Sequence, residues 1–282
     1  PGIRQPRAPP NNHDKTTKRL RDWENGMDLG IKGRKAIICA SSRGLGKACA
    51  LALAKEGVDI VINGLDTRRL EVTAAEIRAA TGVNVVAVAA DITTEEGRAK
   101  LLAACPQADI LINNNAGPQP GEFLDWDHDQ WIKALEGNML AAVLMIRGVL
   151  PGMVGRIVNI LSAMTKSPRD PSLGLSTAAR TALIGASKSL SRSVMVNNVT
   201  LNNLLPERID TDRQKFMAER MMKAQGITMA EARQQIADSL PAKRFGTTEE
   251  FGSTCAFVCS AHAGFMTGQN IQLDGGSYEG LV

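Results

Sequence analysis

The segment GLSTAARTALIGASKSLS, residues 174–191, carries a hydroxyl at Ser176 and a guanidinium at Arg180. Residues four apart lie on one face of a helix, and the segment is typical of the start of a buried helix. Such a pair could orient a substrate and complete a proton transfer, or it could be what remains of a lost active site. The whole chain contains one tyrosine, Tyr278.

A second stretch with chemical potential is CASSRGLGKACALALAKEG, residues 39–57. Gly44 and Gly46 allow the backbone to approach a phosphate closely, and the N-terminus of the following helix offers free N–H groups and a partial positive charge. A tight turn that needs glycine for packing alone is the other interpretation, because glycine spacing by itself is a weak signal.

The elements that position Ser176, Arg180 and the glycine-rich stretch can be predicted from the pattern of apolar residues. Short apolar runs alternate along the chain with segments of helical period. We predict seven strands, within KAIICA, VDIVIN, NVVAVAAD, ADILINN, GRIVNIL, VTLNNLLP and QNIQLDG. Alternating strands and helices require right-handed crossovers. The prediction is a single-domain, Rossmann-type, doubly wound α/β fold, with a seven-stranded mostly parallel sheet, helices on both faces and its ligand beyond the carboxyl ends of the strands.

Length and composition indicate one domain, residues 27–282, preceded by a segment of different character. Residues 1–26 are rich in Pro, Asn and charge, so we expect a disordered tail or a non-native remnant, with Met27 as the natural start. The net charge of +4 is concentrated in this segment, where six Lys and Arg residues lie, and the rest of the chain is close to neutral, which argues against nucleic-acid binding. No apolar run suggests a signal peptide or a membrane span. Five cysteines, an odd number, favour free thiols in the cytoplasm.

Several motifs in order resemble the short-chain dehydrogenase/reductase family: ASSRGLG, NNAG from Asn114 to Gly117, Asn138, Ser162 and MTGQNIQLDGG near the end. The resemblance implies hydride transfer between a nicotinamide cofactor and a small carbonyl or alcohol substrate, with an Asn, Ser, Tyr and Lys tetrad. It also implies a homo-oligomer, a tetramer or a dimer. The departures below indicate a divergent branch similar to proteins labelled 3-oxoacyl-carrier-protein reductase-like.

Matched to the tetrad, two residues agree and two differ. Asn138 falls where the family has a backbone kink and a water for proton relay. Ser162 falls where a hydroxyl would hold the substrate oxygen, although an ordinary strand-end hydroxyl is the alternative. Ser176 stands in place of the tyrosine and Arg180 in place of the lysine. Serine cannot be acidified comparably by one cation, and arginine is effectively never deprotonated, so we expect a slow enzyme in which Arg180 still holds the nicotinamide ribose.

The cofactor residues carried over from the resemblance are Ala40, Ser42, Arg43, Gly44, Leu45, Gly46, Asp91, Ile92, Asn115, Ala116, Gly117, Arg180, Pro206, Ile209 and Thr211. Ala40 replaces the family's first loop glycine, and Glu207 replaces the glycine after Pro206. Gly64 ends the second strand where an NAD-preferring relative would carry an acid, and Arg43 lies where NADP-preferring relatives carry a base. We therefore predict NADP, with NAD as the alternative. Asp91 could instead cap the next helix.

No metal site is predicted, and no histidine aligns with the active-site elements. Lys166, Arg169 and Asp170 are close enough in sequence to overhang the site, but we interpret them as a solvated loop. Tyr278 could enter the site of a neighbouring subunit, but we interpret it as a packing residue. The Met-rich segment 211–245 suits an apolar ligand or, alternatively, an amphipathic helix pair packed on the sheet. Two functions stay open: an NADP-dependent oxidoreductase, and a dinucleotide-binding protein without turnover that acts as a sensor or partner subunit.

Overall fold

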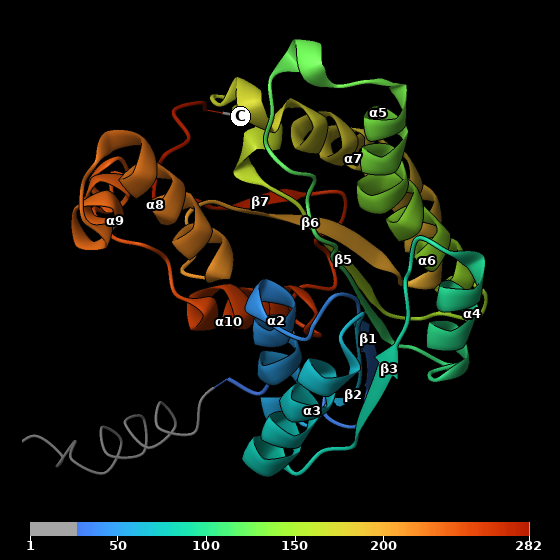
Figure 1. The fold of residues 1–282 in the computed structure, drawn as a ribbon. Helices are drawn as coiled ribbons and strands as arrows, with labels where there is room; N and C mark the ends of the chain where they lie inside the picture. Colours follow the sequence, from blue (N-terminus) through green and yellow to red (C-terminus); the bar gives the residue numbers. More distant parts are fainter. Residues whose placement is uncertain (1–26, 282) are drawn as a thin grey trace, which may run out of the picture.

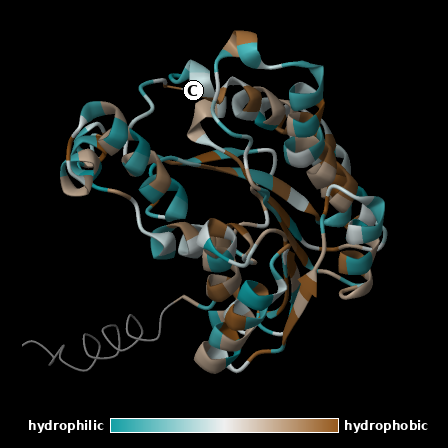
Figure 2. Ribbon diagram, viewed as in Figure 1, coloured by the Kyte–Doolittle hydropathy of each residue, from teal (hydrophilic) through white to brown (hydrophobic). Residues whose placement is uncertain are grey.

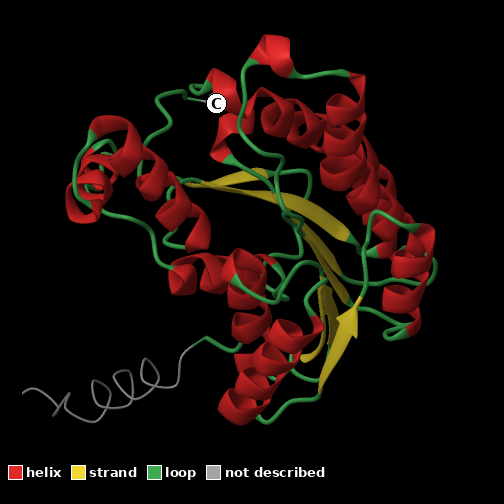
Figure 3. Cartoon of the chain, in the orientation of Figure 1, coloured by secondary structure: helices red, strands yellow, loops and turns green. Residues whose placement is uncertain are grey.

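Seven parallel strands form the centre of the molecule in a computed structural model that describes residues 27–281 (Figures 1 and 3). The predicted tail therefore lies outside the described residues. The strands are β1 (Lys35–Ile38), β2 (Asp59–Gly64), β3 (Val85–Ala89), β4 (Ile110–Asn113), β5 (Arg156–Ile160), β6 (Thr200–Pro206) and β7 (Asn270–Leu273). Their order in the sheet is β3-β2-β1-β4-β5-β6-β7, with every neighbouring pair parallel. The doubly wound prediction is confirmed.

Helices connect the strands and several begin at side-chain caps, such as Asp66, Thr94 and Thr247. The helices are α2 (Gly44–Lys55), α3 (Thr67–Thr81), α4 (Glu95–Ala103), α5 (His128–Leu135), α6 (Ala141–Val149), α7 (Gly174–Val194), α8 (Asp212–Gln225), α9 (Met229–Asp238) and α10 (Thr248–Val258). Short 3-10 turns are η1 (Phe123–Asp125), η3 (Ala163–Thr165), η4 (Pro171–Leu173) and η5 (Met195–Asn197), and a π-helical turn is η2 (Glu136–Leu140). Within residues 27–281, no helix is long and apolar enough to cross a membrane.

The two faces of the sheet bury separate apolar cores, because side chains alternate along each strand. Ala36 and Ile38 of β1 pack in the core that α2, α3 and α10 cover. Ile37 and Cys39 pack in the other core, against α4, α6 and α7. Figure 2 shows the hydrophobic colours running along the central strands. Strands buried on both faces explain why the apolar runs are nearly continuous.

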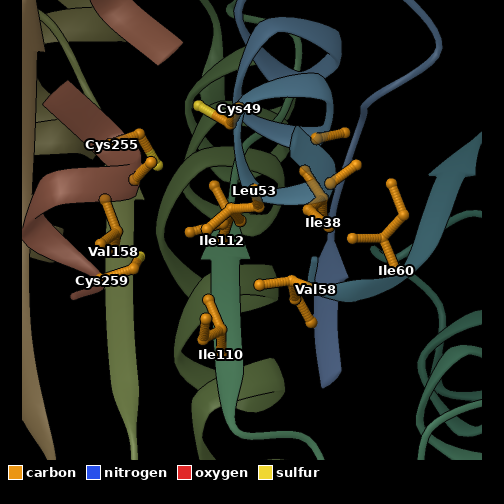
Figure 4. Packing of buried hydrophobic residues seen from close by; sticks show 14 of the residues in the cluster. Ile38, Cys49, Leu53, Val58, Ile60, Ile110, Ile112, Val158, Cys255 and Cys259 are labelled. Carbon is orange, nitrogen blue, oxygen red and sulfur yellow. The ribbon is translucent and has the colours of Figure 1, made fainter. Parts of the chain in front are cut away.

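All five cysteines are buried and free, as expected. Cys49 of α2, Cys255 of α10 and Cys259, the residue that follows α10, lie in the packing between these helices and the sheet (Figure 4). Burial raises the pKa of the Cys39 thiol to about 12. These thiols are therefore held as packing groups rather than as nucleophiles.

Four asparagines form a ladder across one half of the sheet, at matched positions of β4 to β7. Asn113 donates its amide to Asn159 at 2.9 Å, Asn159 donates to Asn203 at 2.9 Å, and Asn203 donates to Asn270 at 2.8 Å. Asn159 also donates to Ser187 of α7 at 2.9 Å. The ladder thus fastens α7, the helix of Ser176 and Arg180, to the sheet.

Candidate active site

The loop between β1 and α2 has the geometry of an anion site. Ala40 and Gly44 adopt positive φ angles of 44° and 56°, so Ala40 occupies a backbone conformation that favours glycine. A Cβ at Gly46 would lie 2.4 Å from the Ala40 carbonyl oxygen, so this position admits no side chain. The first turn of α2 has no acidic residue and no side-chain cap from Arg43. Its N–H groups are available to a phosphate.

Arg43 pairs with a residue that the sequence did not single out. Its Nη1 lies 3.2 Å from Asp212 Oδ2, and the two side chains are 62% and 71% exposed. Asp212 begins α8, and a Cβ at Gly44 would lie 4.0 Å from the methyl of Thr211. The start of α8 therefore lies over the phosphate loop. On the other side of this loop, Gly64 lies against Ser42, where an acidic side chain is indeed missing.

Asp91 and Ile92 follow β3. Asp91 Oδ1 accepts hydrogen bonds from the backbone and hydroxyl of Thr93 at 2.9 and 2.8 Å. The alternative that Asp91 caps the next helix is wrong, because Thr94 is the cap of α4. Ile92 is buried in the core beneath.

The loop after β4 is joined to the π-helical turn by side-chain amides. Asn115 donates to the Gly137 carbonyl at 2.9 Å, and Asn138 donates to the Ala116 carbonyl at 3.3 Å. Asn114 donates to the Ala40 carbonyl at 3.0 Å and so ties this loop to the phosphate loop. The π-turn is the irregular backbone that the resemblance implied at Asn138.

A small cavity lies behind this loop. Its polar lining comes from Asn113, Asn114, Asn115, Asn138 and Arg180, and the cavity leaves about 20 Å³ for the centre of a water-sized sphere. Asn113 Oδ1 is buried and has no hydrogen-bond partner among the described residues. A site of this size with several polar partners suits one buried water.

Ser176 and Arg180 touch, as their spacing on α7 predicts. Arg180 Nη1 donates to Ser176 Oγ. A Cβ at Gly117 would lie 3.0 Å from Arg180 Nη2, so the guanidinium lies flat against the β4 loop. Burial, and secondarily the charge of Arg213, lowers the pKa of Arg180 to about 10, which leaves it protonated at neutral pH.

Ser162, at the end of β5, accepts a hydrogen bond from the backbone of Met164 at 3.2 Å. Its hydroxyl therefore also serves as a strand-end cap. Among the described residues no hydrogen bond joins it to Ser176. Of the other assigned residues, Pro206 ends β6, Ile209 is buried and bridges to Gly246, and Leu45 packs on the core.

The loop that follows Ser162 is held to the rest of the protein by side-chain contacts, so its interpretation as a solvated loop is wrong. Arg169 forms an ion pair with Glu207 and donates to the Ser277 carbonyl at 3.3 Å. Only 7% of the Glu207 side chain is exposed, and a carboxylate this buried requires a cation. Lys166 Nζ lies 4.4 Å from the centroid of the Tyr278 ring, which is a packing role for that tyrosine. Asp170 caps η4.

Most methionines of segment 211–245 lie inside the helix pair rather than toward a ligand. Met221, Met222 and Met229 pack around a small buried core shared by α8 and α9. The amphipathic helix pair is therefore the better interpretation, although α8 and α9 pack on each other around this separate core rather than on the sheet. Arg213, the second residue of α8, was not among the predicted site residues, although its place two residues after Thr211 was a usable signal.

Comparisons with known proteins show which proteins this chain is similar to. A family model described as "Enoyl-(Acyl carrier protein) reductase" matches residues 39–278. The NADPH-dependent reductase BacG of Bacillus subtilis is 33% identical over 257 residues, covering 88% of this chain and 99% of BacG. The 3-oxoacyl-[acyl-carrier-protein] reductase FabG of Aquifex aeolicus is 29% identical, over 89% of this chain and all of FabG. The crystal structure of L-sorbose reductase from Gluconobacter frateurii, complexed with NADPH and L-sorbose, matches with a TM-score of 0.85 and 32% identity, over 90% of this chain and 100% of that one.

Proposed function

This chain belongs to the short-chain dehydrogenase/reductase family, and we propose that it is an NADPH-dependent oxidoreductase that reduces the carbonyl group of a small molecule. The proposal assigns the chemistry to an atypical set, Asn138, Ser162, Ser176 and Arg180. The observation that carries it is the hydrogen bond from Arg180 to Ser176. That bond occupies the serine oxygen as an acceptor and leaves the serine proton free for another oxygen.

The residues of the phosphate loop fit a dinucleotide. The uncapped N-terminus of α2 would take the pyrophosphate, and the positive φ at Ala40 and Gly44 shapes the loop for its approach. Arg43 would face a ribose 2′-phosphate that no acid at Gly64 repels, which favours NADPH over NADH. NADPH when bound supplies a hydride to the carbonyl carbon.

In this proposal the protein handles the proton and the orientation of the substrate. Ser162 and Ser176 hydrogen-bond the carbonyl oxygen, and the charge of Arg180 stabilises the negative charge that develops there. Ser176 donates its proton to that oxygen. The serine is reprotonated from water, and the cavity beside Asn138 and Arg180 is suited to hold that water. Serine is a weaker acid than tyrosine, so we expect slow turnover.

The test is carbonyl-dependent oxidation of NADPH, followed by loss of its absorbance, across ketones, quinones and oxo acids. We expect Ser176→Ala to lower kcat by about a hundredfold, the low end of the usual contribution of a general acid. Ser193 is an exposed serine on the same helix whose hydroxyl donates to the Leu190 carbonyl, so Ser193→Ala should leave kcat unchanged. If the protein binds NADPH but no carbonyl consumes it, the chain is instead a dinucleotide-binding protein without turnover.

The proposal also includes a cytoplasmic, homo-oligomeric protein. Five buried, reduced thiols suit a reducing compartment. The side chain of Phe265 is 98% exposed on the described chain, and an apolar ring in this position suits a contact with a second copy.

A further inference from the structure

The segment 163–173, which joins Ser162 to the start of α7, has little packing of its own. Ala163 is its one buried apolar residue, and its regular structure is limited to the short 3-10 turns η3 and η4. The asparagine ladder holds α7 at Ser187, about three helical turns away from Ser176. The position of Ser176 relative to Ser162 therefore also depends on how the segment between them is held.

A closed polar cluster joins this segment to two other parts of the chain. Arg169 donates to the carboxylate of Glu207 and, at 3.3 Å, to the hydroxyl of Ser277. That hydroxyl donates in turn to Glu207 Oε2 at 2.5 Å. Glu207 directly follows β6 and Ser277 lies beyond β7, so the cluster connects segments at the carboxyl ends of three neighbouring strands, β5, β6 and β7. Figure 1 shows the C-terminal end of the chain beside the segment that precedes α7.

Further contacts support the same arrangement from both sides of the segment. Lys166 lies over the Tyr278 ring and its Nζ donates to Gln272 Oε1 at 3.5 Å. On the other side, the Ser172 carbonyl accepts a hydrogen bond from the backbone of Gly121, in the loop after β4, at 3.0 Å. Segment 163–173 is thus held between the C-terminal residues and the β4 loop.

The burial of Glu207 makes the position of Arg169 a requirement of the fold. The Glu207 side chain is 7% exposed and takes part in no other ion pair among the described residues. A buried carboxylate that loses its cation keeps its cost of desolvation, so breaking such a pair is strongly unfavourable. The ion pair between Arg244 and Glu250 differs, because both of its side chains are about half exposed, and exposed pairs contribute little.

We propose that Arg169, Glu207 and Ser277 are positioning residues of the active site, which fix segment 163–173 and so set the hydroxyl of Ser162 relative to that of Ser176. The inference rests on the proposed carbonyl reduction, in which both hydroxyls bond one oxygen. The three residues themselves do not contact that oxygen in the proposal. Two donors to one atom must be held closely, since a displacement of about 1 Å can lower a rate by a hundredfold.

The first measurement is steady-state kinetics with a carbonyl that the natural protein reduces. Arg169→Met keeps the length of the side chain but removes the cation, and we expect kcat to fall by about 10- to 100-fold while the Kd of NADPH is unchanged. Arg169→Lys keeps the charge and should retain most of kcat. Arg169→Met combined with Glu207→Gln should be faster than Arg169→Met alone, because no unpaired buried charge remains. Arg244→Met, which breaks an exposed pair, should leave kcat unchanged.

The second measurement is hydrogen exchange of the protein without cofactor or substrate. The amides of Thr165, Lys166 and Leu173 bond carbonyls within or next to the segment, so their exchange reports its local opening. We expect Arg169→Met to speed their exchange by about tenfold, as loss of a buried partner should. Exchange in α2 should be unchanged, which separates local loosening from global destabilisation.

The two measurements separate the inference from the function on which it rests. The inference is overturned if Arg169→Met leaves exchange of the segment unchanged, or if exchange rises and kcat does not fall. It is also overturned if Arg169→Lys is as slow as Arg169→Met, or if NADPH affinity falls as much as kcat. If no carbonyl consumes NADPH, the reductase function is contradicted, and exchange alone then decides whether the cluster holds the segment.

Discussion

In the proposed function, the ion pair between Arg43 and Asp212 would compete with the 2′-phosphate of NADPH for the same guanidinium. Changing Asp212→Asn removes the carboxylate and releases Arg43 toward a 2′-phosphate. Both side chains are mostly exposed, at 62% and 71%, and ion pairs of this kind contribute about 0.2–1 kcal/mol. We therefore expect NADPH to bind roughly 1.5- to 5-fold more tightly. NADH has no 2′-phosphate, so its affinity should not change.

The assay is titration of each cofactor by quenching of protein fluorescence, at low and at high salt. The gain should shrink as salt rises, because screening weakens exposed charge pairs. Asp210→Asn is the matched control, since Asp210 lies two residues earlier and pairs with Arg233 at 2.8 Å. It removes the same charge without releasing Arg43.

A third variant, Arg43→Ala, should weaken the binding of NADPH by about tenfold, because a charge-assisted contact is lost. The reasoning would be refuted by equal gains for NADPH and NADH in Asp212→Asn, or by an equal effect of Asp210→Asn. Undiminished NADPH affinity in Arg43→Ala would remove the role assigned to that residue.

Two further predictions concern the atypical pair and the last helix. Ser176→Tyr combined with Arg180→Lys should raise kcat for neutral ketones by roughly a hundredfold, because the double change restores a phenolic acid beside a cation. If steady-state kinetics show no rise in kcat, the role of Ser176 as the proton donor is contradicted. Glu250, bonded first by the Arg244 side chain and then by the Thr247 backbone, has its pKa lowered from 4.5 to about 2. Its contribution to stability is therefore complete above pH 4.5 and is lost as the pH falls toward 2. The free energy of unfolding, measured by urea denaturation, should fall as the pH is lowered from 4.5 toward 2, and Glu250→Gln should reduce this dependence on pH. If the variant shows the same dependence as the natural protein, the effect assigned to Glu250 is excluded.

The fold could be predicted because its signal is local. Each strand is a short apolar run, and each observed strand lies within its predicted segment apart from the terminal residue Gly64 of β2. The contact between Ser176 and Arg180 was also predictable, since it depends only on the spacing of residues along one helix.

The rest of the site depends on contacts between distant segments. Arg43 and Asp212 are 169 residues apart in the chain, and Arg169 meets Glu207 and Ser277 only because three loops converge at one edge of the sheet. In the sequence, Glu207 was notable only because it replaces a glycine of the family, but in the structure its carboxylate anchors the loop after Ser162 through Arg169. Charge alone could not show which arginines are paired, so Arg213 went unnoticed.

The asparagine ladder disfavours incorrect registers of the strands during folding. All its amides point the same way, so each nitrogen meets the oxygen of the next strand. If β5 slipped by one residue, Asn159 would leave the row and Val158 or Ile160 would replace it, stranding the amides of Asn113 and Asn203 in an apolar interior. Each stranded group would cost about 1–3 kcal/mol. Each misaligned strand would thus lower the stability of the sheet further, and only the correct alignment allows Asn159 to bond Ser187 and so to fix α7, with its Ser176 and Arg180 pair, on the sheet.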